Sequence, residues 1–141
     1  MIDDNKIVLD IPKGMEVDVE KSDLKAGVIK LRKKEICYAD VLSTLADKDI
    51  YPAEIKVPNL FAGKIIALAR LMTIAKYYNG DWKPDWNSHE YKHNIMRTSE
   101  YGITSCGNYN EGAIYFKNKE DAQAVIDNPN FRSILDAIYK D

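Results

Sequence analysis

The chain contains little cysteine and almost no net charge, and each shortage excludes a class of protein. Two cysteines in 141 residues, Cys37 and Cys106, are too few for a disulfide framework. The 20 lysines and arginines nearly balance the 22 aspartates and glutamates, which leaves a formal net charge of −2. Non-specific binding to nucleic acid or to an anionic membrane requires an excess of basic residues. We therefore expect two free thiols in a reducing compartment and no membrane partner.

Targeting signals and common catalytic motifs are also missing. The N-terminal segment MIDDNKIVLDIP has two acids before a short apolar run, whereas a secretory signal peptide begins with a basic segment and a longer apolar one. We therefore expect the protein in the cytoplasm. The sequence has no P-loop, no dinucleotide-binding glycine motif, no Ser-His-Asp set and no C-x-x-C pair. We expect no cofactor.

The most informative stretch runs from Asn59 to Trp86, NLFAGKIIALARLMTIAKYYNGDWKPDW. At about 100° per residue, apolar side chains collect on one broad face, which predicts a single long helix packed on the core. The predicted core face consists of Phe61, Ile65, Leu68, Leu71, Met72, Ala75 and Tyr78. Cations interrupt the run and both flanks are polar, so we do not expect a membrane span.

The other face and the ends of this helix carry further predictions. Ile66, Ala69 and Tyr77 dilute the polar face, so we expect something to cover part of that face as well. Asn59 is the expected N-cap, because its side chain accepts hydrogen bonds from free backbone N–H groups. Gly80 supplies the left-handed conformation that ends a helix.

Shorter periodic patterns flank the central helix. Period-two alternation predicts strands at 7–11, 15–19, 26–34, 91–98, 102–106 and 112–117. Spacings of three and four predict a helix at 38–48, another after Asn118 and a last one from Pro129. Together they predict one α+β domain over residues 1–141. In it, the long central helix and the C-terminal helices pack on one face of a small antiparallel sheet.

The segment HEYKH at positions 89–93 matches the H-E-x-x-H motif of zinc peptidases. In such an enzyme His89 and His93 bind zinc from one helix face while Glu90 activates water. The flanking residues favour a strand, on which the two histidines would lie about 13 Å apart. No other histidine exists to complete the site. A zinc-dependent hydrolase is therefore the alternative hypothesis, and two surface histidines are the simpler interpretation.

Aromatic and charged residues are densest just after the central helix, at Trp82, Lys83, Asp85, Trp86 and Tyr91. Tryptophans beside carboxylates stack on bases or sugars, or anchor a protein partner. A proline between them stiffens the segment. The more common role of such a segment is a rigid connector whose indoles close the end of the core. If the chain has a binding surface, we expect it here.

Five segments carry a resemblance: IPKGMEVDVEKSD, VIKLRKKE, LARLMTIAKYYNGDWKPDW, YKHNI and AIYFKNKEDA. Together they resemble a family of small uncharacterised phage- and prophage-type proteins of gut bacteria, and NGDWKPDW is the most specific part. The resemblance covers most of the chain and implies an accessory role without a known activity. We therefore predict a non-catalytic binding module whose partner is a protein or a single-stranded nucleic acid.

Overall fold

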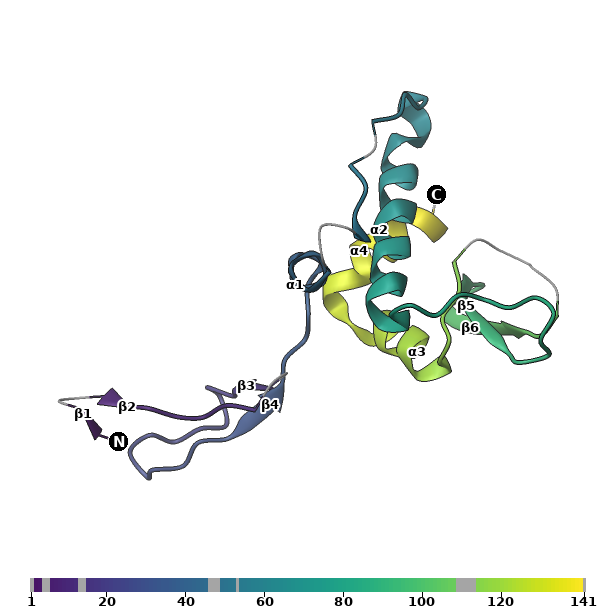
Figure 1. The fold of residues 1–141 in the computed structure, drawn as a ribbon. Coiled ribbons are helices and arrows are strands. Elements are labelled where there is room, and N and C mark those ends of the chain that lie inside the picture. Colours follow the sequence, from purple (N-terminus) through teal and green to yellow (C-terminus); the bar gives the residue numbers. More distant parts are fainter. Residues whose placement is uncertain are drawn as a thin grey trace. The chain divides into compact units, whose positions relative to one another are not determined.

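The computed structural model describes residues 2–3, 6–12, 15–45, 49–52, 54–108 and 114–140. The chain divides into two compact units, Met1–Glu35 and Ile36–Asp141, which are described separately below. Figure 1 shows helices and antiparallel strand pairs in separate stretches of the chain, so the predicted α+β class is confirmed. The single domain stays a prediction.

The N-terminal unit consists of two short antiparallel strand pairs (Figure 1). Strand β1 (Ile2–Asp3) pairs with β2 (Lys6–Ile7), and β3 (Met15–Val17) pairs with β4 (Leu31–Lys33). Of the described side chains before residue 36, Asp18 alone is buried. Backbone pairing and polar contacts therefore hold this unit together, because it has almost no apolar core.

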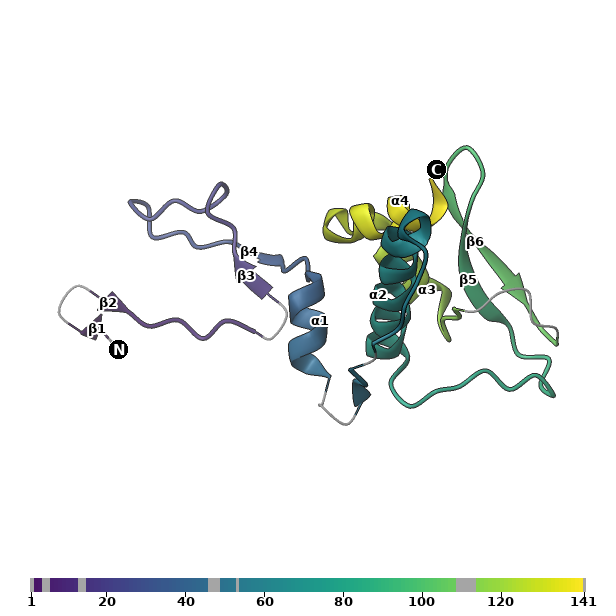
Figure 2. The ribbon, with the colours of Figure 1, turned by 90° about the horizontal axis from the view of Figure 1, so that it is seen from above.

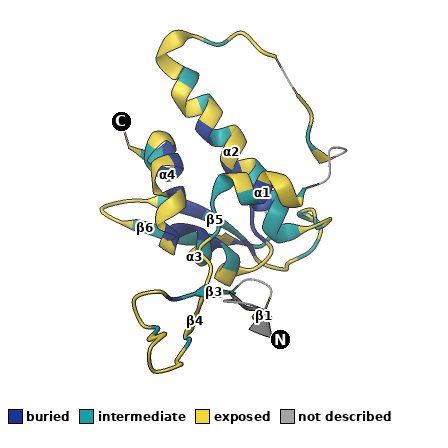
Figure 3. Cartoon of the chain, turned by 90° about the vertical axis from the view of Figure 1, so that its left-hand side faces the viewer, coloured by how far each residue is buried: buried dark blue, intermediate teal, exposed yellow. Residues whose placement is uncertain are grey.

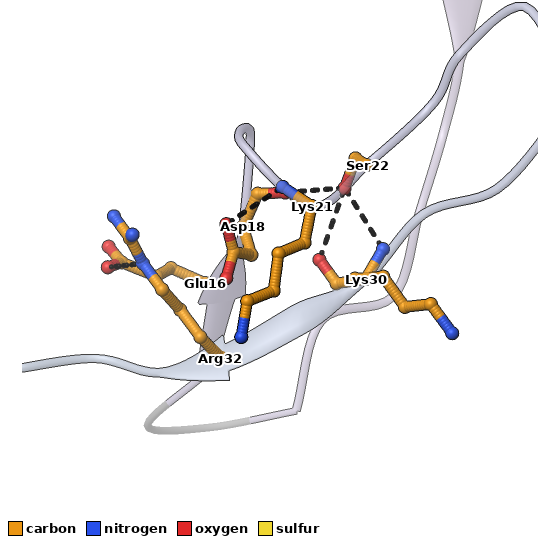
Figure 4. A network of polar contacts seen from close by, with 6 residues as sticks. All are labelled: Glu16, Asp18, Lys21, Ser22, Lys30 and Arg32. Atoms are coloured by element: carbon orange, nitrogen blue, oxygen red, sulfur yellow. Dashed lines mark hydrogen bonds and ion pairs between the residues drawn. The ribbon is translucent and has the colours of Figure 1, made fainter.

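Where β3 and β4 end, one backbone bond from the Asp18 N–H to the Lys30 carbonyl (2.8 Å) is joined by side-chain hydrogen bonds (Figure 4). The Ser22 hydroxyl donates to the Asp18 carbonyl over 2.6 Å and accepts from the Lys30 N–H over 3.0 Å. Closer to the strand pair, the Arg32 Nε donates to Glu16 Oε1 over 2.8 Å. Serine and aspartate compete in this way with regular backbone pairing, which is why the strands are shorter than predicted.

The predicted strand at 26–34 is correct only for its second half. Val28 forms an isolated antiparallel bridge with Asp23, and regular pairing begins again at Leu31. In the turn between Asp23 and Val28, Gly27 has a φ of 70°, a left-handed conformation that suits a turn and not a strand.

The C-terminal unit is built around the central helix. A 3-10 turn, η2 (Asn59–Phe61), leads into α2 (Ala62–Asn79), which packs against α1 (Tyr38–Thr44) and α4 (Arg132–Tyr139). Figure 2 shows the two-stranded ribbon of β5 (Lys92–Arg97) and β6 (Tyr101–Cys106); α3 (Lys119–Asp127) packs on this ribbon. A second 3-10 turn, η3 (Pro129–Phe131), joins α3 to α4.

One apolar core joins these elements. Its fully buried members come from α1, α2, β5, the segment around Phe116, and the two C-terminal helices. The largest of the fully buried apolar side chains in this core are Val41, Leu71, Ile74, Phe116, Val125, Phe131 and Leu135. The central helix packs against the last helix, α4, and this part of the predicted arrangement is confirmed.

The predicted core face of α2 is partly wrong. Leu71 and Ala75 are buried as expected, but Ala67 and Ile74 complete the buried face. Met72 is 54% exposed. Apolar residues occur on every side of the helix, interspersed with Lys64, Arg70 and Lys76, so periodicity alone did not determine which side meets the core. Figure 3 shows buried residues mainly in the C-terminal part of α2, while much of its N-terminal part is exposed.

The predicted element ends have mixed outcomes. Gly80, with a φ of 61°, follows the last residue of α2, so the predicted stop is confirmed. Asn59 is not the N-cap: Pro58 precedes η2, and no side chain caps the turn. Asn118 is the N-cap of α3 as predicted. The helix predicted at 38–48 ends at Thr44, and positions 46–48 lie outside the described residues.

Of the strand predicted at 112–117, the described residues form one isolated β-bridge. Phe116 pairs antiparallel with His93 on the free edge of β5, with N–H to carbonyl distances of 2.7 and 3.1 Å. Positions 112 and 113 lie outside the described residues. Within the described part of the chain, no helix has both the length and the apolar content needed to cross a membrane.

Candidate functional site

The segment after α2, residues 80–91, contains the aromatic side chains that the sequence analysis selected, and we call it the connector. Backbone and side-chain hydrogen bonds order its turns. The Trp82 N–H donates to the Asn79 carbonyl over 3.2 Å, and Asp85 Oδ1 accepts from the Asn87 N–H over 2.9 Å. At the helix end, Lys76 Nζ donates to the Gly80 carbonyl over 2.8 Å. The connector therefore has a defined conformation without regular secondary structure.

Trp86 packs inward from the connector. Its ring meets the buried ring of Tyr115 edge-on, with centroids 5.0 Å apart. Lys92, at the start of β5, lies with Nζ 5.1 Å from the indole centroid. The Lys92 ammonium also donates to the carbonyls of Ser88 (2.9 Å) and Gly107 (2.6 Å). Trp86 therefore links the connector to the hairpin and to Tyr115.

Lys92 is the largest fully buried side chain in the described part of the chain, with 1% of it exposed. An ammonium removed from water destabilises a fold unless hydrogen bonds or charges replace its hydration. Two carbonyls and the face of an indole provide that replacement here. Lys92, the fourth residue of the HEYKH segment, thus joins the connector to the hairpin, a role that the sequence pattern does not indicate.

The five predicted binding residues divide into two groups. Trp86 is partly buried in the contacts described above, and Trp82 is also partly buried. Lys83, Asp85 and Tyr91 are exposed, Tyr91 to 65%. Only this second group is exposed to solvent as a whole. The binding role of the connector remains a prediction.

The HEYKH segment does not have the geometry of a zinc peptidase motif. Residues 89–91 lie in no helix, and β5 begins at Lys92. His93 is part of the sheet, and its Nδ1 lies 2.6 Å from the Ser105 hydroxyl. Burial, followed by the positive charge of Lys119, lowers the pKa of His93. In the described residues, no three histidine, cysteine or acidic side chains cluster as metal ligands.

A different set of exposed apolar side chains lies along η2 and α2, on more than one side of the helix. Four side chains of η2 and α2 that are at least half exposed, here called the α2 apolar surface, are Leu60, Phe61, Ile66 and Met72. Tyr51 and Ile55, in the segment that leads to η2, are 88% and 69% exposed. The position of Ile66 among the polar residues of the helix is a partial signal of this exposure.

Comparison with known proteins gives no match: neither a protein-family model, nor a curated protein, nor a solved structure shows significant similarity to this chain. The function is therefore argued from the geometry.

Proposed function

We propose that this protein is a non-catalytic binding module whose α2 apolar surface binds a protein partner. The observation that carries the proposal is the exposure of apolar side chains at the start of the central helix and along it: Leu60 of η2 (85%), and Ile66 (53%) and Met72 (54%) of α2. A group of exposed apolar side chains marks an interaction site. The resemblance to phage-type proteins adds an accessory role to this proposal.

The charges near this surface favour an acidic partner. Between positions 55 and 80 the sequence contains Lys56, Lys64, Arg70 and Lys76 and no aspartate or glutamate, although the whole chain has a net charge of −2. Of these four cations, Lys76 already pairs with Asp81 over 3.2 Å. Complementary charges at the rim of an interface steer association and fix its register. The same cations disfavour a second copy of α2 as the occupant, because two such helices would bring like charges together.

A protein fits the surface better than a single-stranded nucleic acid. Sequence-tolerant binding of single strands combines a basic groove with aromatic rings on which the bases stack. Here the exposed side chains are mainly aliphatic, and Phe61 is the one aromatic member of the α2 apolar surface. Aliphatic helix faces instead bind grooves or other helices of proteins.

The proposal is tested by crosslinking followed by a binding measurement. A photoreactive amino acid at Ile66 should crosslink the partner in an extract of the cells that express the protein, and mass spectrometry should identify it. With the purified partner, Ile66→Asp and Leu60→Asp should each weaken binding by about tenfold or more, since an interfacial apolar contact of this size contributes over 1 kcal/mol. Because both side chains are exposed, the circular dichroism spectrum should not change.

The matched control is Tyr91→Asp, an equally exposed position on the connector. It should leave the affinity unchanged. Loss of binding in Tyr91→Asp but not in Ile66→Asp would move the interface to the connector and overturn the proposal. Two other results would also overturn it: tight binding of single-stranded oligonucleotides that Arg70→Gln abolishes, or a homodimer in sedimentation that Ile66→Asp dissociates.

A further inference from the structure

A polar pocket of about 420 Å³ lies in the C-terminal unit, where the end of the β5–β6 hairpin meets α3 and α4. Pockets of this volume accommodate small molecules. Its charged and aromatic lining comprises Arg97, Glu100, Tyr101, Asp127, Arg132 and Lys140. None of these residues belongs to the connector or to the α2 apolar surface, so the pocket is separate from the proposed protein interface.

Tyr101 positions two arginines at this pocket. The guanidinium carbons of Arg132 and Arg97 lie 5.0 and 5.8 Å from the centre of its ring. The Tyr101 hydroxyl is held in turn, because it donates to Asp136 Oδ1 over 2.7 Å. Arg132 also donates from Nη2 to the Ile126 carbonyl over 3.3 Å. The two cations are thus held near one ring, from β5 and from α4.

The negative charge of Asp136 attracts Arg132, but neither pocket arginine is held in an ion pair with a described carboxylate. Across the described ranges of the chain, neither Arg97 nor Arg132 forms an ion pair within 4.0 Å of an acidic oxygen. The nearby Asp136 is paired with Lys140 over 3.3 Å and accepts the tyrosine hydroxyl. Asp127 accepts from the Gln123 amide over 3.0 Å. Two guanidiniums with free N–H donors therefore line the pocket, and one of its two carboxylates, Asp127, already accepts a hydrogen bond.

We propose that this pocket binds the phosphate group of a small molecule, through Arg97 and Arg132. Guanidinium groups present paired N–H donors that match phosphate oxygens, and such charge-assisted hydrogen bonds are stronger than neutral ones. A phosphate dianion would supply the negative charge that both arginines lack. Glu100, the remaining acid of the lining, offers an acceptor for a hydroxyl group on the rest of the ligand.

The test is a titration of ¹⁵N-labelled full-length protein, followed by NMR, with inorganic phosphate and with ribose 5-phosphate at constant ionic strength. Saturable shifts should appear at the Nε–H signals of Arg97 and Arg132. Either probe supports the oxyanion site, and tighter binding of the ester would show that the rest of the pocket contacts the ligand. Sodium chloride at matched ionic strength should give no saturable shift.

Variants distinguish a specific phosphate site from general electrostatic attraction of the anion to the protein. Arg97→Gln and Arg132→Gln should each weaken binding by about tenfold, the loss expected when a charged hydrogen-bond partner is removed. The matched control is Arg70→Gln, an arginine outside the pocket that also lies over a tyrosine ring, 5.5 Å from Tyr38. It should not change the affinity. Equal weakening in all three variants, or no saturable shift up to about 10 mM of either probe, would overturn the proposal.

Discussion

The Asn79 side chain makes the structure's most specific link between helix and sheet. Its Nδ2 donates to the Tyr115 carbonyl over 2.7 Å, and its Oδ1 accepts from the Lys117 N–H over 3.0 Å. On the other side, the backbone of Phe116 pairs with His93. The amide of the last residue of α2 thus takes the place of a neighbouring strand, and it holds the segment that buries Phe116 completely.

The cost of Asn79→Ala follows from these contacts. Each of the two hydrogen bonds contributes about 1 kcal/mol net, and more where the acceptor is shielded from water. Alanine is a better helix former than asparagine by about 0.6 kcal/mol, which offsets part of the loss. We expect a net loss of about 1.5–3 kcal/mol in the free energy of unfolding. Asn79→Asp should cost at least as much, since it keeps the acceptor but places a carboxylate oxygen against the Tyr115 carbonyl.

Equilibrium urea unfolding, followed by tryptophan fluorescence, measures this difference. The matched control is Asn87→Ala, an exposed asparagine of the connector, which should change stability by less than about 0.5 kcal/mol. If Asn79→Ala cost no more than Asn87→Ala, the two hydrogen bonds would not hold the segment around Phe116, and the reasoning would fail.

Three further predictions concern the core, the thiols and the dependence of stability on acidic pH. Leu71→Ala, at a fully buried site, should cost about 2–5 kcal/mol, whereas Met72→Ala should cost under about 1 kcal/mol; the reverse order would place the core on the other face of α2. Both cysteines are free, so titration of the denatured, unreduced protein should count two thiols, and in the native state the partly exposed Cys37 should react before the buried Cys106; a count of zero would contradict this. A hydrogen bond from a tyrosine hydroxyl is the main cause that lowers the pKa of Asp136. The contribution of Asp136 to the free energy of unfolding is therefore complete above the ordinary pKa of aspartate and decreases below about pH 4. In a plot of the free energy of unfolding against pH, Asp136→Asn should reduce the slope below about pH 4. An unchanged slope would contradict this prediction.

Local patterns predicted the elements well where the signal was short-range. The end of α2 at Gly80 and the start of α3 after Asn118 depend on the conformation of one or two residues. Glycine and asparagine favour these conformations, so the residue types alone predict both ends. The paired strands at 92–97 and 101–106 follow from alternation and from the short turn between them. The predicted N-terminal strands are longer than the observed ones. Beyond the observed strands, the Ser22 hydroxyl bonds to the Asp18 carbonyl and to the Lys30 N–H, and regular strand pairing stops.

The sequence by itself determined the α+β class, the long central helix and its end, the two C-terminal helices and the absence of a disulfide framework. These features depend on periodicity, turn chemistry and composition, which are local properties. The tertiary structure alone decided which side of α2 is buried, why Lys92 is inside, and that Arg97 and Arg132 meet at one tyrosine. Each of these features depends on contacts between residues that are far apart in the chain. The type of a side chain, apolar or charged, does not determine which distant residues will pack against it and exclude water.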